Sequence, residues 1–150
     1  MIGVAEPARS SRAQEAVNHA MNLCVRKGVR LTALRERALE ALADAGRPVK
    51  AYDLLPALGE GDAPAKPATA YRALEFLEDL GLVHKVAGIN AFVLCAHGGG
   101  SHVTTLYVCE KCGSADERAE HAAPATPPPA GFRVERSVVE HYGLCADCAA

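Results

Sequence analysis

The chain has 150 residues, a formal net charge of −2 and six cysteines. Its 49% hydrophobic content includes 29 alanines, so the large apolar side chains form only a thin core, and something besides hydrophobic burial is expected to stabilise part of the chain. No window of eighteen apolar residues exists and residues 1–10 lack an apolar signal segment, which argues against a membrane span and predicts a cytoplasmic protein with reduced thiols.

Two helices are predicted near the N-terminus. The first lies between a capping-box pattern at 11–14 and Gly28, and the second lies between the N-cap residue Thr32 and Gly46. Residues 26–50 contain seven basic and three acidic side chains, a local net charge of +4. Such a segment can bind a polyanion although the whole chain is slightly acidic.

A third helix is predicted to start at 51–55, where Pro56 must kink or shorten it. Residues 59–67, with two glycines and two prolines, indicate a loop. Pro67 then opens the clearest helix of the chain, which Gly81 ends. Its apolar positions recur at helical spacing: Ala70, Ala73, Leu74 and Leu77.

A hairpin is predicted next, because two β-type runs at 82–86 and 91–95 flank a turn signal at 88–90. A four-residue turn would place His84 opposite Val93. Several helices followed by a two-stranded hairpin is the order of elements typical of a winged helix-turn-helix, a DNA-binding fold.

The second half of the chain is predicted to be rich in strands. The runs 103–108 and 132–139 are β-rich, and a short helix is expected at 114–121. The four prolines of 122–131 predict a connecting loop. The fold class expected for the whole chain is therefore α+β.

Two CxxC motifs carry the strongest chemical signal. A gap of two residues lets both sulfurs of a tight turn face one ion, and Gly113 after the first motif can take the positive φ that such a turn needs. Four thiolates suit a closed tetrahedral structural zinc site, although a pair of redox dithiols is the alternative. The predicted ligands are Cys109, Cys112, Cys145 and Cys148.

A second ligand set is less obvious from spacing. Cys95 is expected diagonal to His84 on one face of the hairpin, and a set of nitrogen, sulfur and oxygen ligands suits zinc better than iron(II) or manganese. The alternative is a hairpin histidine and a buried cysteine of no chemical interest. The candidate ligands are His84, Cys95, His102 and Glu117.

Other residues carry weaker signals. Cys24 lies on an apolar helical face and is expected in the core. A third metal position could use His97, His121 or His141. The motifs HExxH, GxSxG, GxGxxG and Walker A do not occur, so no enzymatic activity and no small organic substrate are predicted.

The order of these elements, with the paired CxxC motifs, resembles the ferric uptake regulator family of metal-dependent bacterial repressors, and its zinc uptake regulator subgroup in particular. The resemblance runs from about residue 20 to the C-terminus. It rests on the segments 29–32, 51–55, 65–77, 81–86, 92–95 and 141–148.

The resemblance implies a homodimer that binds palindromic, A·T-rich operator DNA when loaded with zinc and represses zinc-uptake genes. It implies structural zinc on the four CxxC cysteines and regulatory zinc on the second ligand set, two ions per chain with a third possible. It also implies DNA contacts by Tyr52, Lys66, Thr69, Tyr71 and Arg72, with Arg72 on the recognition helix.

The resemblance also divides the chain. Residues 1–90 are expected to form the winged-helix DNA-binding domain, with 1–11 flexible and 82–92 as wing and hinge; residues 91–150 are expected to form a small α/β dimerisation domain that holds the four-cysteine zinc site. The proline-rich 122–129 replaces a longer helix of the family and is expected to alter the dimer interface. Two alternatives remain: a family repressor that senses iron, manganese or peroxide, and a zinc-stabilised protein-interaction module.

Overall fold

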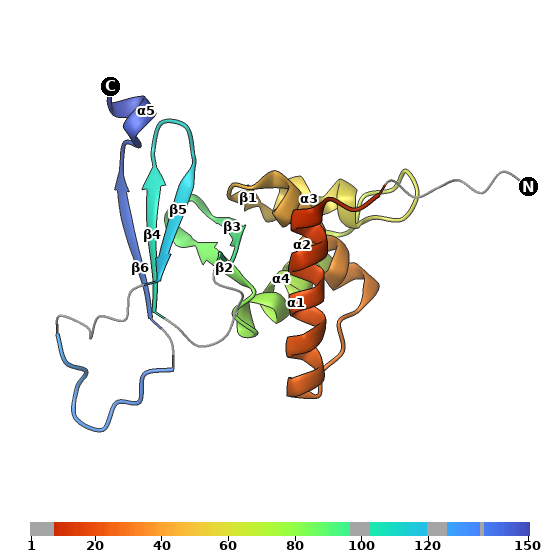
Figure 1. The fold of residues 1–150 in the computed structure, drawn as a ribbon, viewed down its shortest axis with the longest axis horizontal. Coiled ribbons are helices and arrows are strands. Elements are labelled where there is room, and N and C mark those ends of the chain that lie inside the picture. The colour runs from red at the N-terminus through yellow and green to blue at the C-terminus, as the bar shows by residue number, and fades with distance from the viewer. Residues whose placement is uncertain (1–7, 97–102, 120–125, 136) are drawn as a thin grey trace, which may run out of the picture.

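The computed structural model describes residues 8–96, 103–119, 126–135 and 137–150. Four helices and a small sheet form the first part, and a second sheet with a short helix forms the rest (Figure 1). The first part contains α1 (Ser11–Lys27), α2 (Ala33–Ala45), β1 (Val49–Lys50), α3 (Ala51–Leu58), α4 (Pro67–Asp79), β2 (Val83–Val86), the 3-10 turn η1 (Ala87–Ile89) and β3 (Ala91–Leu94). The second contains β4 (Val103–Cys109), β5 (Ala115–Ala119), β6 (Ser137–Gly143) and α5 (Ala146–Ala149).

The helix ends follow their capping residues closely. Thr32 and Gly46 bound α2 as predicted, and Gly28 ends α1 in the left-handed conformation with φ 68°. The capping box predicted at 11–14 is one residue late, because Ser10 is the N-cap and its hydroxyl accepts a hydrogen bond from the Ala13 N–H. Pro67 opens α4, as predicted.

The hairpin has the predicted register, with His84 opposite Val93. The strand β1 was not predicted; its two residues pair with β3, so the first sheet has the order β1-β3-β2. The apolar stripes of α2 and α4 pack on this sheet around fully buried side chains: Leu39, Leu42, Leu74, Leu77 and Phe92. Four helices closed by a hairpin are the expected winged-helix arrangement.

The second sheet corrects two predictions. The helix predicted at 114–121 is wrong, since 115–119 is the strand β5 and pairs antiparallel with β4. The strand predicted at 132–139 is misplaced, since 132–135 is irregular and β6 runs over 137–143, parallel to β4. Pairing with β4 overrides the local helix propensity of Ala-Asp-Glu-Arg-Ala in β5.

A small second core joins the hairpin to the second sheet. Val86 of β2 packs with Leu106 and Val108 of β4, and all three are buried. The hairpin accordingly lies between the helices and the second sheet (Figure 1). Elements of the two parts therefore share apolar contacts and not only a connecting segment.

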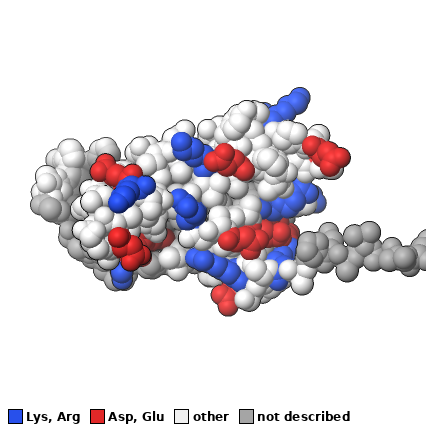
Figure 2. Space-filling view, turned by 90° about the horizontal axis from the view of Figure 1, so that it is seen from above, with Lys and Arg blue, Asp and Glu red and all other residues white. Residues whose placement is uncertain are grey.

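Charges on the helical part are largely intermixed. Arg9 forms ion pairs with Glu36 and Glu40 of α2. Figure 2 shows basic and acidic groups side by side on the viewed face, without a large area of one sign. Among the residues that the structure describes, no helix is both long and apolar enough to cross a membrane.

Candidate metal centres and nucleic-acid interface

The parallel pairing of β4 and β6 brings the two CxxC motifs together. Cys109 ends β4 opposite Gly143, which ends β6. After Cys109 the chain makes a tight turn through Gly113, whose φ of 73° favours glycine. After Gly143, Cys145 caps α5 and Cys148 lies within it. Both turns therefore open at the same end of the sheet.

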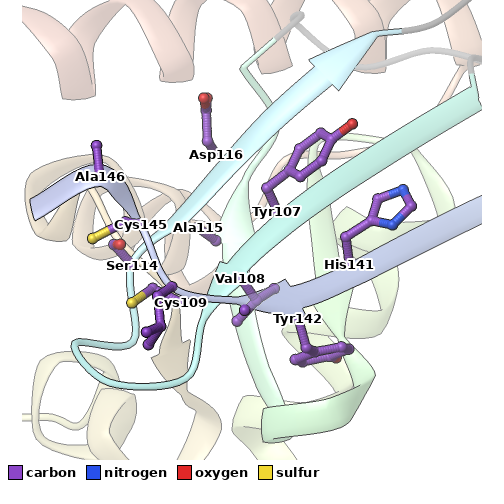
Figure 3. Close-up of a pocket in the computed structure, with 12 residues that line it drawn as sticks. Tyr107, Val108, Cys109, Ser114, Ala115, Asp116, His141, Tyr142, Cys145 and Ala146 are labelled. Carbon is purple, nitrogen blue, oxygen red and sulfur yellow. The ribbon is translucent and has the colours of Figure 1, made fainter. Parts of the chain in front are cut away.

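A cavity of about 490 Å³ lies along this end of β4 and β6. Cys109 and Cys145 line one side of it, and the rings of Tyr107 and His141 stack on the other with centroids 4.9 Å apart (Figure 3). His141, a candidate for a third metal position, is exposed and lies in neither of the ligand groups found among the described residues.

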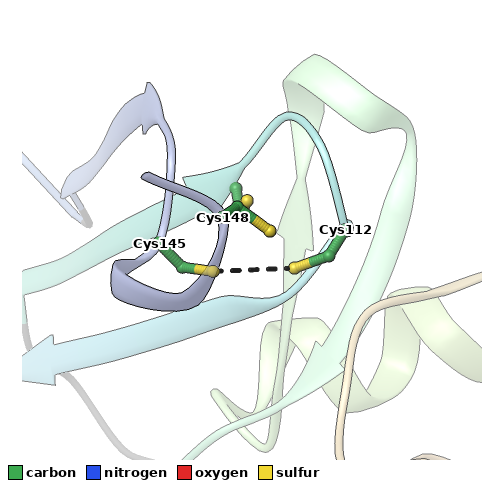
Figure 4. Close-up of side chains that lie close together, drawn as sticks. Cys112, Cys145 and Cys148 are labelled. Atoms are coloured by element: carbon green, nitrogen blue, oxygen red, sulfur yellow. Dashed lines mark hydrogen bonds between the residues drawn. The ribbon is translucent and has the colours of Figure 1, made fainter. Parts of the chain in front are cut away.

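The four cysteine sulfurs have the spacing of a tetrahedral site. All four Sγ atoms lie within 4.8 Å of one another, and the Sγ atoms of Cys112 and Cys145 are 3.9 Å apart (Figure 4). A tetrahedron with Zn–S bonds of about 2.3 Å has edges of about 3.8 Å. The donor set therefore fits zinc in both ligand type and distance.

The pKa values of these thiols differ from one another because of their hydrogen bonds. Hydrogen bonds from the backbone of Cys112 and Cys145 lower the pKa of Cys109 to about 6, and Ser114 lowers the pKa of Cys112. The neighbouring sulfurs, Cys145 first, raise the pKa of Cys148 to about 12. Four adjacent thiolates repel one another unless a cation compensates their charge.

The second cluster joins the hairpin to the second sheet. His84 lies in β2, Cys95 directly follows β3 and Glu117 lies in β5. Glu117 Oε1 is 3.0 Å from His84 Nε2 and 3.7 Å from Cys95 Sγ. An S···O separation of about 3.6 Å is expected for two ligands of one tetrahedral zinc. Among the described residues, these three side chains bring a nitrogen, a sulfur and an oxygen ligand atom within 4.8 Å of one another, a donor set that suits zinc.

The surroundings of this cluster orient Glu117 and charge His84. The second carboxylate oxygen of Glu117 accepts a hydrogen bond from the Ala96 N–H at 2.7 Å. Burial opposes the charged imidazole, but hydrogen bonds and negative charge from Cys95 and Glu117 raise the pKa of His84 to about 9. The site therefore attracts positive charge. The fourth predicted ligand, His102, lies outside the described residues, as do His97 and His121.

The residues predicted to contact DNA lie on α3 and around α4. Tyr52 projects from α3 with 74% of its surface exposed, and Arg72 is exposed on α4. Lys66 precedes Pro67 as the N-cap of α4, and Thr69 is half-buried. Tyr71 contacts Phe92 of β3 edge to face, so it also joins α4 to the hairpin.

Two further arginines were not singled out from the sequence. Arg35 of α2 lies over the Phe76 ring and lines, with Thr69 and Arg72, a hollow of about 180 Å³ between α2 and α4. Arg47 donates a hydrogen bond of 2.8 Å to the carbonyl of Cys112. Both lie in the basic segment 26–50, which was the available signal.

Cys24 is buried in α1, as predicted for a core residue.

The edge strand β6 and its neighbours carry several exposed apolar side chains, namely Tyr107, Val138, Val139, Tyr142 and Leu144. Such a surface is typical of an interface with another chain.

Comparison with known proteins places these features in context. Residues 26–125 match the sequence profile of the ferric uptake regulator family. The chain is 36% identical to the zinc uptake regulation protein of Escherichia coli (strain K12) over 140 residues, which cover 90% of this chain and 82% of that protein.

Solved structures agree with this similarity. A zinc uptake regulator complexed with zinc and DNA is 35% identical with a TM-score of 0.80, and the alignment covers 93% of this chain and 97% of the other. The crystal structure of holo XcZur is 40% identical with a TM-score of 0.74, covering 90% and 97%. The apo structure of XcZur is similar at a TM-score of only 0.53, with 35% identity, covering 94% and 100%.

Proposed function

The chain belongs to the ferric uptake regulator family, and we propose that it is a zinc-responsive transcriptional repressor. In this function the zinc-loaded dimer binds palindromic, A·T-rich operator DNA and represses zinc-uptake genes. The observation that carries the proposal is the second cluster, in which His84 of the hairpin meets Glu117 of the second sheet beside the thiol of Cys95. A relative solved with zinc and DNA supports it.

Two zinc sites per chain are proposed. Cys109, Cys112, Cys145 and Cys148 hold a structural ion, which clips the ends of β4 and β6 together and supplements the thin core. The regulatory ion is assigned to His84, Cys95, His102 and Glu117. The thiolate of Cys95 favours zinc over iron(II) and manganese at this site.

The regulatory residues act on the orientation of the two parts. When bound, zinc supplies a positive centre that three or four side chains can share. His84 and Cys95 then keep the hairpin against β5, the strand that carries Glu117. We call this the closed arrangement, and zinc binding makes it more populated. The chain is more similar to the holo than to the apo structure of XcZur, which supports the assignment of the arrangement described above to the loaded state.

A fixed orientation matters because DNA half-sites are one helical turn, about 34–36 Å, apart. In a dimer, each α4 must meet its own major groove at that spacing. Arg72, Thr69 and Tyr71 are proposed to contact the DNA from α4, with Lys66 at its start and Tyr52 from α3. The hollow beside Arg35 and Arg72 is suited to a backbone phosphate.

We also propose a domain organisation for the chain. Residues 1–90 form the DNA-binding domain and 91–150 the zinc-binding dimerisation domain, although β3 (Ala91–Leu94), which follows this boundary in sequence, pairs with β1 and β2 of the first domain. The exposed apolar side chains of Val138, Val139 and Leu144 are suited to the dimer contact. A protein of this function acts in the cytoplasm and is not an enzyme.

A metal titration of DNA binding tests the proposal. Duplex DNA is selected from a random pool with the zinc-loaded protein, and its binding is then measured against free zinc, iron(II) and manganese(II), with zinc counted per chain. We expect two tightly bound zinc ions and binding that zinc alone stimulates. Stimulation by iron(II) or manganese(II) would assign a different metal, and no selected duplex would point to a protein-interaction module.

A further inference from the structure

The turn of the hairpin is bonded to the edge strand of the second sheet by groups that are not candidate metal ligands. Glu140 in β6 accepts hydrogen bonds from the backbone N–H of Ala87 at 2.7 Å and of Gly88 at 3.3 Å. The Tyr142 hydroxyl also accepts from the Gly88 N–H, at 2.9 Å, and it donates to the Glu140 carboxylate. We call this network the wing clasp.

The shape of the wing clasp requires glycine at one position. A Cβ atom on Gly88 would lie 2.0 Å from the hydroxyl oxygen and 2.3 Å from Cζ of Tyr142. The φ of Gly88 is not in the left-handed region, so its backbone conformation does not demand glycine. The demand comes from the close approach of the Tyr142 ring to the turn.

The charges of the wing clasp support its hydrogen bonds. Burial raises the pKa of Glu140, but the hydrogen bonds from Tyr142, Ala87 and Gly88 outweigh it and hold the pKa below its ordinary value. The carboxylate therefore accepts three hydrogen bonds in its ionised form at neutral pH. Hydrogen bonds to a charged group are stronger than neutral ones.

We propose that Glu140 and Tyr142 are positioning residues that hold the hairpin turn against the second sheet without metal and so set the zinc concentration needed for DNA binding. This inference rests on the proposed function. The wing clasp and the set His84, Cys95 and Glu117 join the same hairpin to the same sheet, so both stabilise one closed arrangement. When that arrangement is only partly populated, the apparent affinity for its ligand falls by the populated fraction.

The test compares full-length Glu140→Gln with wild type in two measurements. The first is the zinc concentration for half-maximal binding of the selected duplex. Loss of about one net hydrogen bond is expected to raise it about five-fold while binding at saturating zinc stays unchanged. The second is hydrogen exchange of the Ala87 and Gly88 amides, which we expect to accelerate in the variant. Glu135→Gln, at an exposed position outside the wing clasp, is the matched control.

A double-mutant cycle separates the wing clasp from general damage. Gly88→Ala should raise the zinc requirement because its Cβ displaces the Tyr142 ring. In a Tyr142→Ala background the same change should add little, since the obstacle is gone. Equal zinc midpoints for wild type and Glu140→Gln, with unchanged amide exchange, would overturn the proposal. If the wild type binds no DNA, the proposed function fails. The wing clasp is then still tested by the exchange of the Ala87 and Gly88 amides, and by the affinity for the second zinc ion, measured in competition with a chelator, in wild type and Glu140→Gln.

Discussion

Glu117 Oε1 in β5 lies 3.0 Å from His84 Nε2 in β2, so one carboxylate joins the second sheet to the hairpin. The pair lies 33 positions apart in sequence, and Cys95 approaches the same oxygen from the end of β3. A group that bridges three strands in this way can report the binding of an ion as a change in their relative position.

Cys95→Ala is expected to abolish zinc-stimulated DNA binding while the structural zinc remains. The change removes the only thiolate from the second cluster, leaving nitrogen and oxygen ligands that bind zinc more weakly. Zinc counted per chain should fall from two to one, measured after dialysis against a weak chelator. Wild-type stimulation in this variant would show that Cys95 is not a regulatory ligand.

Arg72→Ala is expected to weaken binding of the selected duplex by about 1–3 kcal/mol without changing the zinc content. Arg72 is exposed on α4 and belongs to neither group of candidate metal ligands. Its loss should therefore leave the zinc sites intact. Arg133→Ala, at an exposed position in the second part, is the control for loss of one positive charge. Equal losses in the two variants would reduce the role of Arg72 to overall charge.

Much of the first part could be predicted because its signals are local. Thr32 and Gly46 mark the ends of α2 by capping, Pro67 marks the start of α4, and the spacing of the hairpin fixes His84 opposite Val93. The two-residue strand β1 was missed because it is defined only by its pairing with β3. Chain-local patterns do not contain that information.

The second part was predicted less well because its strands depend on distant partners. The segment 115–119 has helix-favouring residues, yet Glu117 lies opposite Leu106 in an antiparallel pair. The shift of β6 to 137–143 follows its parallel register with β4, which the sequence does not specify. The CxxC pairs were recognisable because cysteine spacing encodes the ligand geometry directly. The wing clasp was not, since its carboxylate meets backbone N–H groups 52 and 53 positions away.

Cys145→Ser is expected to release the structural zinc and to lower the thermal midpoint of the whole protein. The Sγ atom of Cys145 lies 3.9 Å from that of Cys112, and a hydroxyl is a much poorer zinc ligand than a cysteine sulfur. Because β6 also carries the wing clasp and the exposed apolar side chains, loss of this site should also weaken dimerisation. Thermal unfolding and sedimentation measure the two effects. Cys24→Ala, which removes one thiol outside the metal clusters, is the control for zinc content and dimerisation, and both should stay unchanged in it. A stable dimer with one zinc fewer would argue against the structural role.

The wing clasp is expected to have its own pH window, bounded by Glu140 below and Tyr142 above. The hydrogen bond to Glu140 is the largest cause that raises the pKa of Tyr142, and burial is the second. The negative charges of Glu140 and Glu110 also raise this pKa, and only the hydrogen bond from the Gly88 N–H lowers it. A raised pKa means that the stabilisation is complete below the ordinary value of 10 and is lost as the pH rises through the higher value. The lowered pKa of Glu140 has the opposite sign, so its contribution is complete above 4.5 and is lost only below that pH.

The Cζ chemical shift of Tyr142 measures the upper limit directly. In Glu140→Gln the phenol loses a charged acceptor, so its pKa should fall toward 10, while Glu135→Gln should leave it unchanged. A Tyr142 titration that is the same in wild type and in Glu140→Gln would mean that the two side chains do not interact in solution.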